Sequence, residues 1–313
     1  MAYVYSNSQY PSTCHKSDLV SERQYLYTGC RTLRIGELII YKDKILGSGA
    51  FGTAFKGEMK SKPCAVKVLK EIGNKISMNL PTVSHVQDNR LNSFEKELKT
   101  LLDLKHPNIV ELLHVCPYPQ HEWPCLVMEL LDCNLQKYLT QNPGCQLSLV
   151  VQISLSCNIA NGLAFLCKKN IIHRDLCGAN ILIQKGHIPV AKIADFGLSR
   201  IAGPSTMTTL GHRNGYLPPE CSSKDYDSSI DIHMFGVTMV QIVHAVENIE
   251  SPEERYKLID EIEESHPLKQ LIKSCVEIER SKRPKAETAY KELQNLLRIH
   301  EHKCYITLDE TPV

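Results

Sequence analysis

The stretch that decides the fold is IIHRDLCGANILI, residues 171–183. Its polar centre lies between apolar, β-branched ends, which predicts a loop joining two short buried segments. Asp175 and Asn180 lie five residues apart in this loop. A carboxylate and a carboxamide so placed can serve a hydroxyl and a metal ion together, because Asp accepts the proton while Asn coordinates Mg²⁺. Fifteen residues after Asn180, the run Asp195-Phe196-Gly197 offers a second oxygen ligand for a hard cation.

Upstream, a glycine-rich run at 47–52 (GSGAFG) lies between two predicted strands. Glycines permit a tight turn whose backbone can approach phosphate oxygens closely. In a dinucleotide-binding fold this pattern should open a helix, whereas residues 53–56 continue as strand, which argues against a nicotinamide cofactor. A glycine-containing hairpin with no ligand is the alternative interpretation. The candidate nucleotide-binding residues of the run are Gly47, Ser48, Gly49 and Gly52.

Lys67 lies in an apolar strand (Ala65–Val68), where a cation is out of place unless it meets an anion. Most such lysines extend their charge to solvent. In the functional interpretation, Lys67 binds the phosphates of a nucleotide and is held in place by a carboxylate on a helix. The amphipathic segment 93–104 carries two candidates, Glu95 and Glu97, and the helical phase favours Glu97. The other glutamate then belongs to a solvated helix face.

Composition excludes several classes of protein. The chain has 313 residues, with 36 Lys+Arg and 35 Asp+Glu, so the near-zero charge gives no electrostatic argument for a nucleic-acid partner. Its 13 cysteines are scattered without a C-x-x-C pair, which disfavours a disulfide framework or a zinc site and indicates reduced thiols in a cytoplasmic protein. Neither a signal peptide nor a membrane span is predicted, and the oligomeric state stays open.

The texture of the chain changes near residue 132. Short apolar, β-branched runs at 38–69, 109–115 and 124–131 indicate strands of an antiparallel sheet, and helical patterns follow at 147–169, 229–246 and 284–299. We therefore expect an α+β fold in which a mostly β lobe precedes a mostly α lobe. The predicted parts are a mobile leader (1–38), the β lobe (39–131), the α lobe (132–300) and a short tail (301–313).

These motifs, in this order, resemble the eukaryotic protein kinase family over about residues 41–299. The resemblance extends to Pro218-Pro219-Glu220, where the family usually has Ala-Pro-Glu, and to Asp231–Gly236 (DIHMFG), which is similar to the family's DVWSFG. Arg283 resembles the late arginine that pairs with the glutamate, here Glu220, in a buried structural ion pair. The texture of 215–220 (GYLPPE) is closest to the tyrosine-kinase-like serine/threonine branch.

The resemblance implies a bilobal kinase fold whose small, mostly antiparallel N-lobe holds one key helix, with MgATP in the cleft and protein substrates as acceptors. It implies transfer of the γ-phosphoryl group to a protein hydroxyl, with Ser/Thr favoured over Tyr. Asp175 would orient and deprotonate the acceptor, Asn180 and Asp195 would bind Mg²⁺, and Lys67 paired with Glu97 would position the phosphates.

The resemblance also implies an adenine pocket. Met128 would guard its back, and the backbone of Glu129 to Leu131 would meet the adenine as the hinge between the lobes. Ala65 and Leu182 would sandwich the ring. Ordinary core packing is the alternative for each of these apolar residues.

Three residues expected near the catalytic aspartate or the γ-phosphate depart from the family pattern. Cys177 and Ala179 occupy the places, two and four residues after Asp175, where the family usually has a cation near the γ-phosphate. Arg213 stands where serine/threonine members place a threonine that touches the catalytic aspartate. One hypothesis is that Arg213 supplies the missing charge to Asp175; the alternative is a solvated arginine. Separately, a phosphate on a hydroxyl of 205–209 could pair with Arg174 and order the segment; the alternative is an unmodified loop.

The departures leave a second function open, that of a nucleotide-binding pseudokinase acting as a signalling scaffold. Against it, the four residues whose loss usually marks a pseudokinase are all present; they are Lys67, Asp175, Asn180 and Asp195. A third possibility, phosphorylation of a small molecule, is disfavoured by the PPE and DIHMFG motifs, which in the family build the peptide-docking platform.

Overall fold

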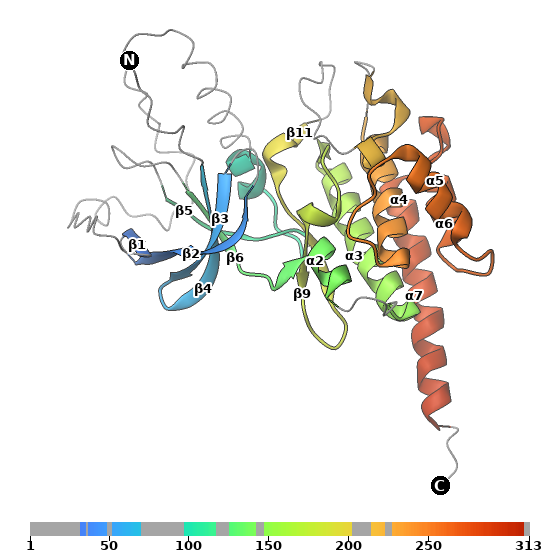
Figure 1. The fold of residues 1–313 in the computed structure, drawn as a ribbon, viewed down its shortest axis with the longest axis horizontal. Helices are drawn as coiled ribbons and strands as arrows, with labels where there is room; N and C mark the ends of the chain where they lie inside the picture. Colours follow the sequence, from blue (N-terminus) through green and yellow to red (C-terminus); the bar gives the residue numbers. More distant parts are fainter. Residues whose placement is uncertain are drawn as a thin grey trace.

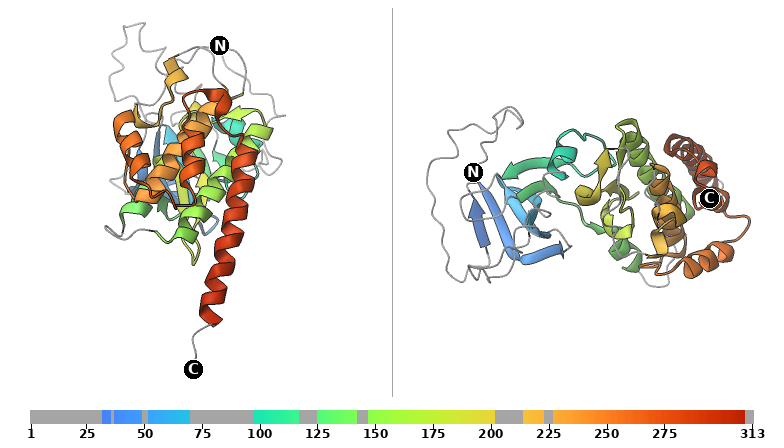
Figure 2. Two further views of the ribbon diagram at one scale, coloured as in Figure 1. Left: turned by 90° about the vertical axis from the view of Figure 1, so that its right-hand side faces the viewer. Right: turned by 90° about the horizontal axis from the view of Figure 1, so that it is seen from above.

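Strands gather at one end of the molecule and helices at the other, as Figures 1 and 2 show for this computed structural model. The two ends are joined at the hinge after β6 (Cys125–Glu129). The α+β, two-lobed architecture expected from the sequence is confirmed. The structure describes residues 32–35, 37–48, 52–69, 97–116, 125–141, 147–201, 214–222 and 227–309.

The N-lobe is a six-stranded sheet in which every neighbouring pair is antiparallel, in the order β1-β2-β3-β4-β6-β5. The remaining strands are β1 (Thr32–Ile35), β2 (Leu38–Ser48), β3 (Gly52–Met59), β4 (Lys62–Leu69) and β5 (Leu112–Cys116). The predicted leader, 1–38, therefore ends earlier than expected, because residues 32–35 pair with β2 in register from Thr32↔Tyr41 to Ile35↔Leu38. Residues 1–31 of that predicted leader lie outside the described residues.

Alternation along β4 decides which side chains face the cleft. Cys64 and Val66 are fully buried and belong to a small core on one face of the sheet. Because side chains of a strand alternate between faces, Ala65 and Lys67 point to the opposite face. That face is the one toward the helical residues 97–102 and the C-lobe, since Lys67 contacts both.

The turn after the helical residues 97–102 is attached to the C-lobe. Val110 N donates to Ile193 O (2.9 Å), and Ile193 N donates to Asn108 O (2.9 Å). The Asn108 side chain donates to Ala191 O (3.1 Å) and accepts from Asn161 (2.8 Å). These buried hydrogen bonds link the turn to the strand that leads directly to Asp195.

The C-lobe is built around α3 (Leu149–Lys168), which packs mainly against α7 (Ala286–Asp309), β10 (Val190–Ile193) and α4 (Ser229–His244). α3 is long and apolar enough to cross a membrane by length and composition, yet most of it is buried inside the fold. The shorter helices α5 (Pro252–Glu261) and α6 (Lys269–Cys275) pack against α4, and α2 (Leu135–Thr140) contacts β7 (Cys133–Asn134) and β9 (Ile181–Gln184). Two small sheets complete the lobe, formed by β7, β9 and β10, and by β8 (Ile171–Ile172) with β11 (Arg200–Ile201).

The helix expected at 284–299 is longer than predicted. α7 continues to Asp309 and so runs through most of the predicted tail, 301–313, extending beyond the other helices of the lobe in Figure 1. The sequence between 286 and 309 contains no Gly or Pro, so no residue that ends a helix follows position 299 within α7. α5 was not predicted at all, although Ser251, whose side chain accepts from Glu254 N (3.1 Å), followed by Pro252, is a typical helix start.

Gly162 places the backbone of α3 against β10, and this contact generates a prediction. A Cβ at this position would lie 2.8 Å from Ile193 Cδ1 and 2.9 Å from Asn108 O. On an exposed helix, alanine in place of glycine gains about 1 kcal/mol. Here Gly162→Ala should lower the free energy of unfolding by about 1–3 kcal/mol, because the overpacking cost exceeds the propensity gain. Urea unfolding measures this value.

The control is Gly186→Ala, because a Cβ at Gly186 meets only Ile188 O, at 3.4 Å. This variant should remain within about 0.5 kcal/mol of the unchanged protein. An unchanged or higher stability of Gly162→Ala would show that α3 and β10 are not packed as described.

Candidate active site

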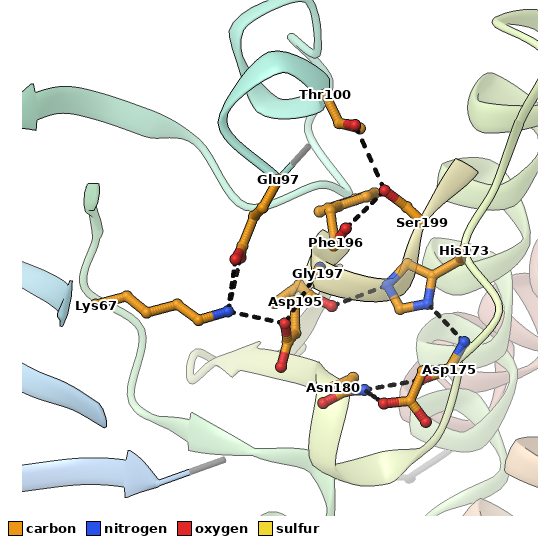
Figure 3. Close-up of polar contacts among 11 residues, drawn as sticks. Lys67, Glu97, Thr100, His173, Asp175, Asn180, Asp195, Phe196, Gly197 and Ser199 are labelled. Carbon is orange, nitrogen blue, oxygen red and sulfur yellow. Dashed lines mark hydrogen bonds and ion pairs between the residues drawn. The ribbon is translucent and has the colours of Figure 1, made fainter. Parts of the chain in front are cut away.

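An ammonium group clamped between two carboxylates lies at the centre of the site. Lys67 Nζ donates to both carboxylate oxygens of Glu97, at 2.8 and 2.7 Å, and to Asp195 Oδ1 at 2.8 Å. The three residues come from β4, from the helical residues 97–102 and from the turn after β10 (Figure 3). Of the two glutamates weighed from the sequence, Glu97 therefore contacts Lys67; Glu95 lies outside the described residues.

Burial makes this contact electrostatically strong. Burial alone would lower the pKa of Lys67, but the charges of Glu97 and Asp195 and their hydrogen bonds raise it above its ordinary value. Burial raises the pKa of Glu97, with the Lys67 charge acting in the opposite direction. Burial also opposes ionisation of Asp195, yet the Lys67 ammonium lowers the pKa of Asp195 below its ordinary value. Lys67 is accordingly a cation and Asp195 an anion at neutral pH.

The segment after Asp195 contacts the same helix a second time. Asp195 itself has φ of 62° and ψ of 75°, a left-handed conformation, and caps the turn formed by Phe196–Leu198. Ser199 Oγ donates to Phe196 O at 2.7 Å and lies 3.4 Å from Thr100 Oγ1 on the helix. Figure 3 shows these contacts above the Lys67 cluster. The helix that carries Glu97 and the turn that carries Asp195 are thus joined at two points.

A buried carboxylate on α4 shapes the loop at 173–180. Asp231 Oδ2 accepts from His173 N (2.7 Å), and Asp231 Oδ1 accepts from Arg174 N (2.8 Å). These bonds support Arg174 at φ 72°, a conformation that costs an L-residue roughly 1 kcal/mol or more. Burial raises the pKa of Asp231, while the two backbone donors favour its charged form. The His173 ring contacts Ala194 O at 2.9 Å, which ties the loop to the residue before Asp195.

Asp175 and Asn180 face each other across this loop. Asn180 Nδ2 donates to the backbone carbonyl of Asp175 and to Asp175 Oδ2, both at 2.7 Å. The amide nitrogen is thereby committed to Asp175, which leaves the amide oxygen as the group available to another ligand. Figure 3 shows this pair below Asp195, on the same side of the site.

The glycine-rich run is described in part. Gly47 and Ser48 end β2, Gly52 begins β3, and Ser48 Oγ lies 3.2 Å from Thr53 Oγ1 across the turn. Gly49 falls outside the described residues. Strand continues after the run, as expected, so no helix begins there.

The predicted adenine-pocket residues come from β4, β6 and β9 and from the segment that follows β6. Ala65 on β4 is the direct neighbour of Met128 on β6. Leu182 is half-buried on β9 between two fully buried neighbours, Ile181 and Ile183, and so faces the other way. Both Met128 and Leu182 pack against the main core, so core packing and ligand contact are not exclusive.

The hinge carries an ion pair that the sequence analysis missed. Lys192 Nζ lies 2.7 Å from Glu129 Oε2, and the same carboxylate accepts from Glu111 N at 2.8 Å. Lys192 is a cation on the short apolar strand β10, which is the same signal that identified Lys67. Glu129 is therefore fixed by its side chain, in addition to the hinge backbone position expected from the sequence.

The ion pair expected between Glu220 and Arg283 is present. Arg283 Nη2 donates to Glu220 Oε2 at 2.9 Å, and Arg283 Nη1 bonds the other carboxylate oxygen. The Arg283 side chain is fully buried. Removing either partner would leave a buried charge at a cost of about 3–5 kcal/mol, so this pair holds the segment before α4 in place.

With this geometry in place, comparison with known proteins identifies the class. A family model described as protein tyrosine and serine/threonine kinase matches residues 40–293. The chain belongs to the protein kinase family. It is 30% identical over 225 residues (69% of this chain) to a probable leucine-rich-repeat receptor-like serine/threonine-protein kinase of Arabidopsis thaliana, of which the match covers 24%.

Two further relatives differ in the acceptor that their names give. A dual specificity protein kinase of Dictyostelium discoideum is 30% identical over 264 residues, covering 78% of this chain and 34% of that protein. A tyrosine-protein kinase of Caenorhabditis elegans is 31% identical over 207 residues, covering 63% of this chain and 15% of that protein. The chain thus matches about a third or less of the length of these relatives.

His233 on α4, in the DIHMFG motif, generates a prediction about pH. Its side chain is fully buried, and both ring nitrogens lack a hydrogen-bond partner. Burial, with the charges of Arg255 and Arg283, lowers the pKa of His233 from 6.5 to about 2. The unfolded chain takes up a proton below about pH 6.5 while the folded chain does not. His233 should therefore lower the free energy of unfolding by about 2 kcal/mol as the pH falls from 7 to 5.

Urea unfolding at pH 7, 6 and 5 measures this contribution. His233→Phe should retain more of its own pH 7 stability at pH 5 than the unchanged protein does, because the titrating ring is gone. The matched control His187→Gln removes an exposed histidine and should leave the pH dependence as it is. An identical pH dependence in His233→Phe would show that the ring is not held neutral.

Proposed function

We propose that this chain is an active protein kinase that transfers the γ-phosphoryl group of MgATP to protein hydroxyls, Ser/Thr in preference to Tyr. The observation that carries the proposal is the three-way contact of Lys67 with Glu97 and Asp195. It joins the sheet, the helix and the turn that would bind the metal, and phosphoryl transfer requires these three parts to be in place together. The Asp175–Asn180 pair lies on the neighbouring loop.

In this proposal Asp175 accepts the proton of the incoming hydroxyl and orients its oxygen toward the phosphorus. Asn180 holds the Asp175 carboxylate through its amide nitrogen, at 2.7 Å, and so sets the direction of the base. Lys67 binds the phosphates of the nucleotide, and Glu97 keeps the ammonium in place. Most of the rate enhancement then comes from positioning and charge stabilisation.

The residues present fit a magnesium ion. Asp195 is held as an anion, and only its Oδ1 is used by Lys67, so its other oxygen can bind a cation. The Asn180 amide oxygen is the second hard donor, since its nitrogen is engaged by Asp175. Two protein oxygens suit Mg²⁺, which takes its other ligands from phosphates and water. When bound, the ion would neutralise charge on the phosphates.

The nucleotide base is proposed to lie between β4 and β9. Ala65 and Leu182 would pack on its two faces, Met128 would close the back of the pocket, and backbone groups of Glu129 to Leu131 would bond its edge. The backbone of Gly47, Ser48, Gly49 and Gly52 would cover the phosphates. The ion pair of Glu129 with Lys192 supports this assignment, because it fixes the conformation of the hinge.

One observation favours the alternative, a nucleotide-binding pseudokinase acting as a scaffold. The usual cation after the catalytic aspartate is replaced by Cys177, whose side chain is buried, and by Ala179. Neither can bind the γ-phosphate as a cation. Arg213, proposed from the sequence as a substitute, lies outside the described residues. The retained Lys67, Asp175, Asn180 and Asp195 support catalysis against this alternative.

Radiolabelled transfer from MgATP to generic protein acceptors tests the proposal. Asp175→Asn should lower transfer about 10²–10⁴-fold, because the variant loses the base, while MgATP affinity stays within about twofold. The label in the unchanged protein should appear on Ser and Thr in phosphoamino-acid analysis. The matched control is Asp103→Asn at an exposed turn, which should transfer normally.

Two outcomes would overturn this assignment. Equal transfer by Asp175→Asn would remove Asp175 from the base role. Absence of transfer by the unchanged protein, despite measurable MgATP binding, would favour the scaffold alternative.

A further inference from the structure

The segment 214–222, which precedes α4, is hydrogen-bonded to buried polar side chains. Tyr216 is 1% exposed, and Gly215 is pressed so closely on the chain after α4 that a Cβ there would overlap the carbonyl oxygen of Ile249. The supporting side chains come from α4 and α5. None of them is part of the proposed catalytic machinery.

Gln241 on α4 joins this segment to the catalytic loop. Its Oε1 accepts from Tyr216 Oη at 2.9 Å, and its Nε2 donates to Glu247 O at 2.6 Å. The same amide lies against Gly178, where a Cβ would be 2.6 Å from both of its polar atoms. Gly178 follows Asp175 by three residues. A movement of Tyr216 would therefore displace the Gln241 side chain, which contacts the loop that carries Asp175.

Arg255 on α5 supplies the second support. It is 2% exposed, and its Nη1 donates to Gly215 O at 3.0 Å and to Leu217 O at 3.3 Å. Within the described part of the chain, Arg255 forms no ion pair with a carboxylate. A buried guanidinium normally needs an anion, because desolvation is expensive. In this structure the guanidinium group donates instead to two backbone carbonyls of the segment 214–222.

Two neighbouring side chains, His233 and Tyr256, whose ring centroid lies 4.8 Å from Arg255 Cζ, do not provide an anion. His233 is neutral, and its two ring nitrogens and Arg255 Nε are all buried without partners. A structure that keeps a buried cation without an ion-pair partner, when an apolar side chain would pack at lower cost, indicates a specific task for that cation. The geometry of the bonds identifies the task as fixing the backbone of Gly215 and Leu217.

We propose that Arg255 is a positioning residue for the protein acceptor. By holding the carbonyls of Gly215 and Leu217, and with Gln241 holding Tyr216, it sets the position of this segment relative to Asp175. An extended peptide that docks on the segment then presents its hydroxyl to Asp175 in the productive geometry. The inference rests on the proposed function, and it assigns acceptor affinity, not nucleotide binding, to Arg255.

The test compares three variants of the full chain. Arg255→Met removes both hydrogen bonds and the charge, and Arg255→Lys keeps the charge but not the forked donor geometry. The matched control, Lys257→Met, removes a cation from the same helix; Lys257 is exposed and pairs only loosely with Glu261, at 3.8 Å. Steady-state transfer is measured against a degenerate Ser/Thr peptide mixture and, separately, against ATP.

Arg255→Met should raise the KM for the peptide mixture at least fivefold and leave the KM for ATP within twofold. Arg255→Lys should lie between this variant and the unchanged protein, and Lys257→Met should match the unchanged protein. A purely structural role would instead reduce peptide and ATP kinetics together. An unchanged peptide KM, or a parallel loss for both substrates, would overturn the inference.

A second measurement separates this inference from the proposed function. Amide hydrogen exchange of 214–222 should become at least fivefold faster in Arg255→Met and remain unchanged in Lys257→Met, whether or not the protein transfers phosphate. If Arg255→Met does not fold, two other variants can be used: Arg255→Lys, and Tyr216→Phe, which removes the hydroxyl that bonds Gln241. Amide exchange of 214–222 should also become faster in both. Unchanged exchange in these folded variants would overturn the inference, even if the kinase activity itself is established.

Discussion

The arrangement of the site depends on one buried ammonium group. Lys67 reaches Glu97 and Asp195 at 2.7–2.8 Å, and these residues lie 30 and 128 positions away in the sequence. An unpaired charge buried at this depth would cost much free energy. The strand, the helix and the turn that carry these residues must therefore come together at one point. The sheet sets the position of Lys67, the helix sets that of Glu97, and the turn after β10 sets that of Asp195.

The C-lobe determines where two of those three groups lie. The turn that follows the helical residues 97–102 is bonded to β10 through Asn108 and Val110, and the ring of His106 stacks on Phe165 of α3, with centroids 4.7 Å apart. The helix bearing Glu97 is therefore attached to the same strand that ends at Asp195. Only Lys67 belongs to the N-lobe sheet. The three-residue contact therefore forms only when the N-lobe sheet and the C-lobe have the relative position described above.

A second buried carboxylate, Asp231, has the corresponding effect within the C-lobe. It supports the left-handed Arg174 and thereby orients the loop from His173 to Asn180. The segment 214–222 is attached to the same helix through Gln241 and to α5 through Arg255. α4, which is buried along nearly its whole length, is thus the common support of the loop that would carry the base and the segment that would carry the acceptor.

Local patterns determined the strands, the long helices and the identities of the charged residues. Lys67 was identifiable because a cation interrupted an apolar strand, and Asp175 and Asn180 because their spacing suits one loop. The same rule applied to Lys192 would have predicted an anionic partner without naming it, and Ser251-Pro252 would have predicted the start of α5. The boundaries of the leader and of the tail could not be placed, since pairing of β1 with β2 and continuation of α7 depend on weak local preferences.

What the sequence determined by itself was the family, the fold class and the list of candidate catalytic side chains, because these follow from residue type and spacing. What only the tertiary structure decided was which groups meet: Glu97 with Lys67, the hinge carboxylate with Lys192, and Arg255 with the carbonyls of 215 and 217. The physical reason is that the free energy of a buried charge depends on partners brought together by packing, which no local pattern records.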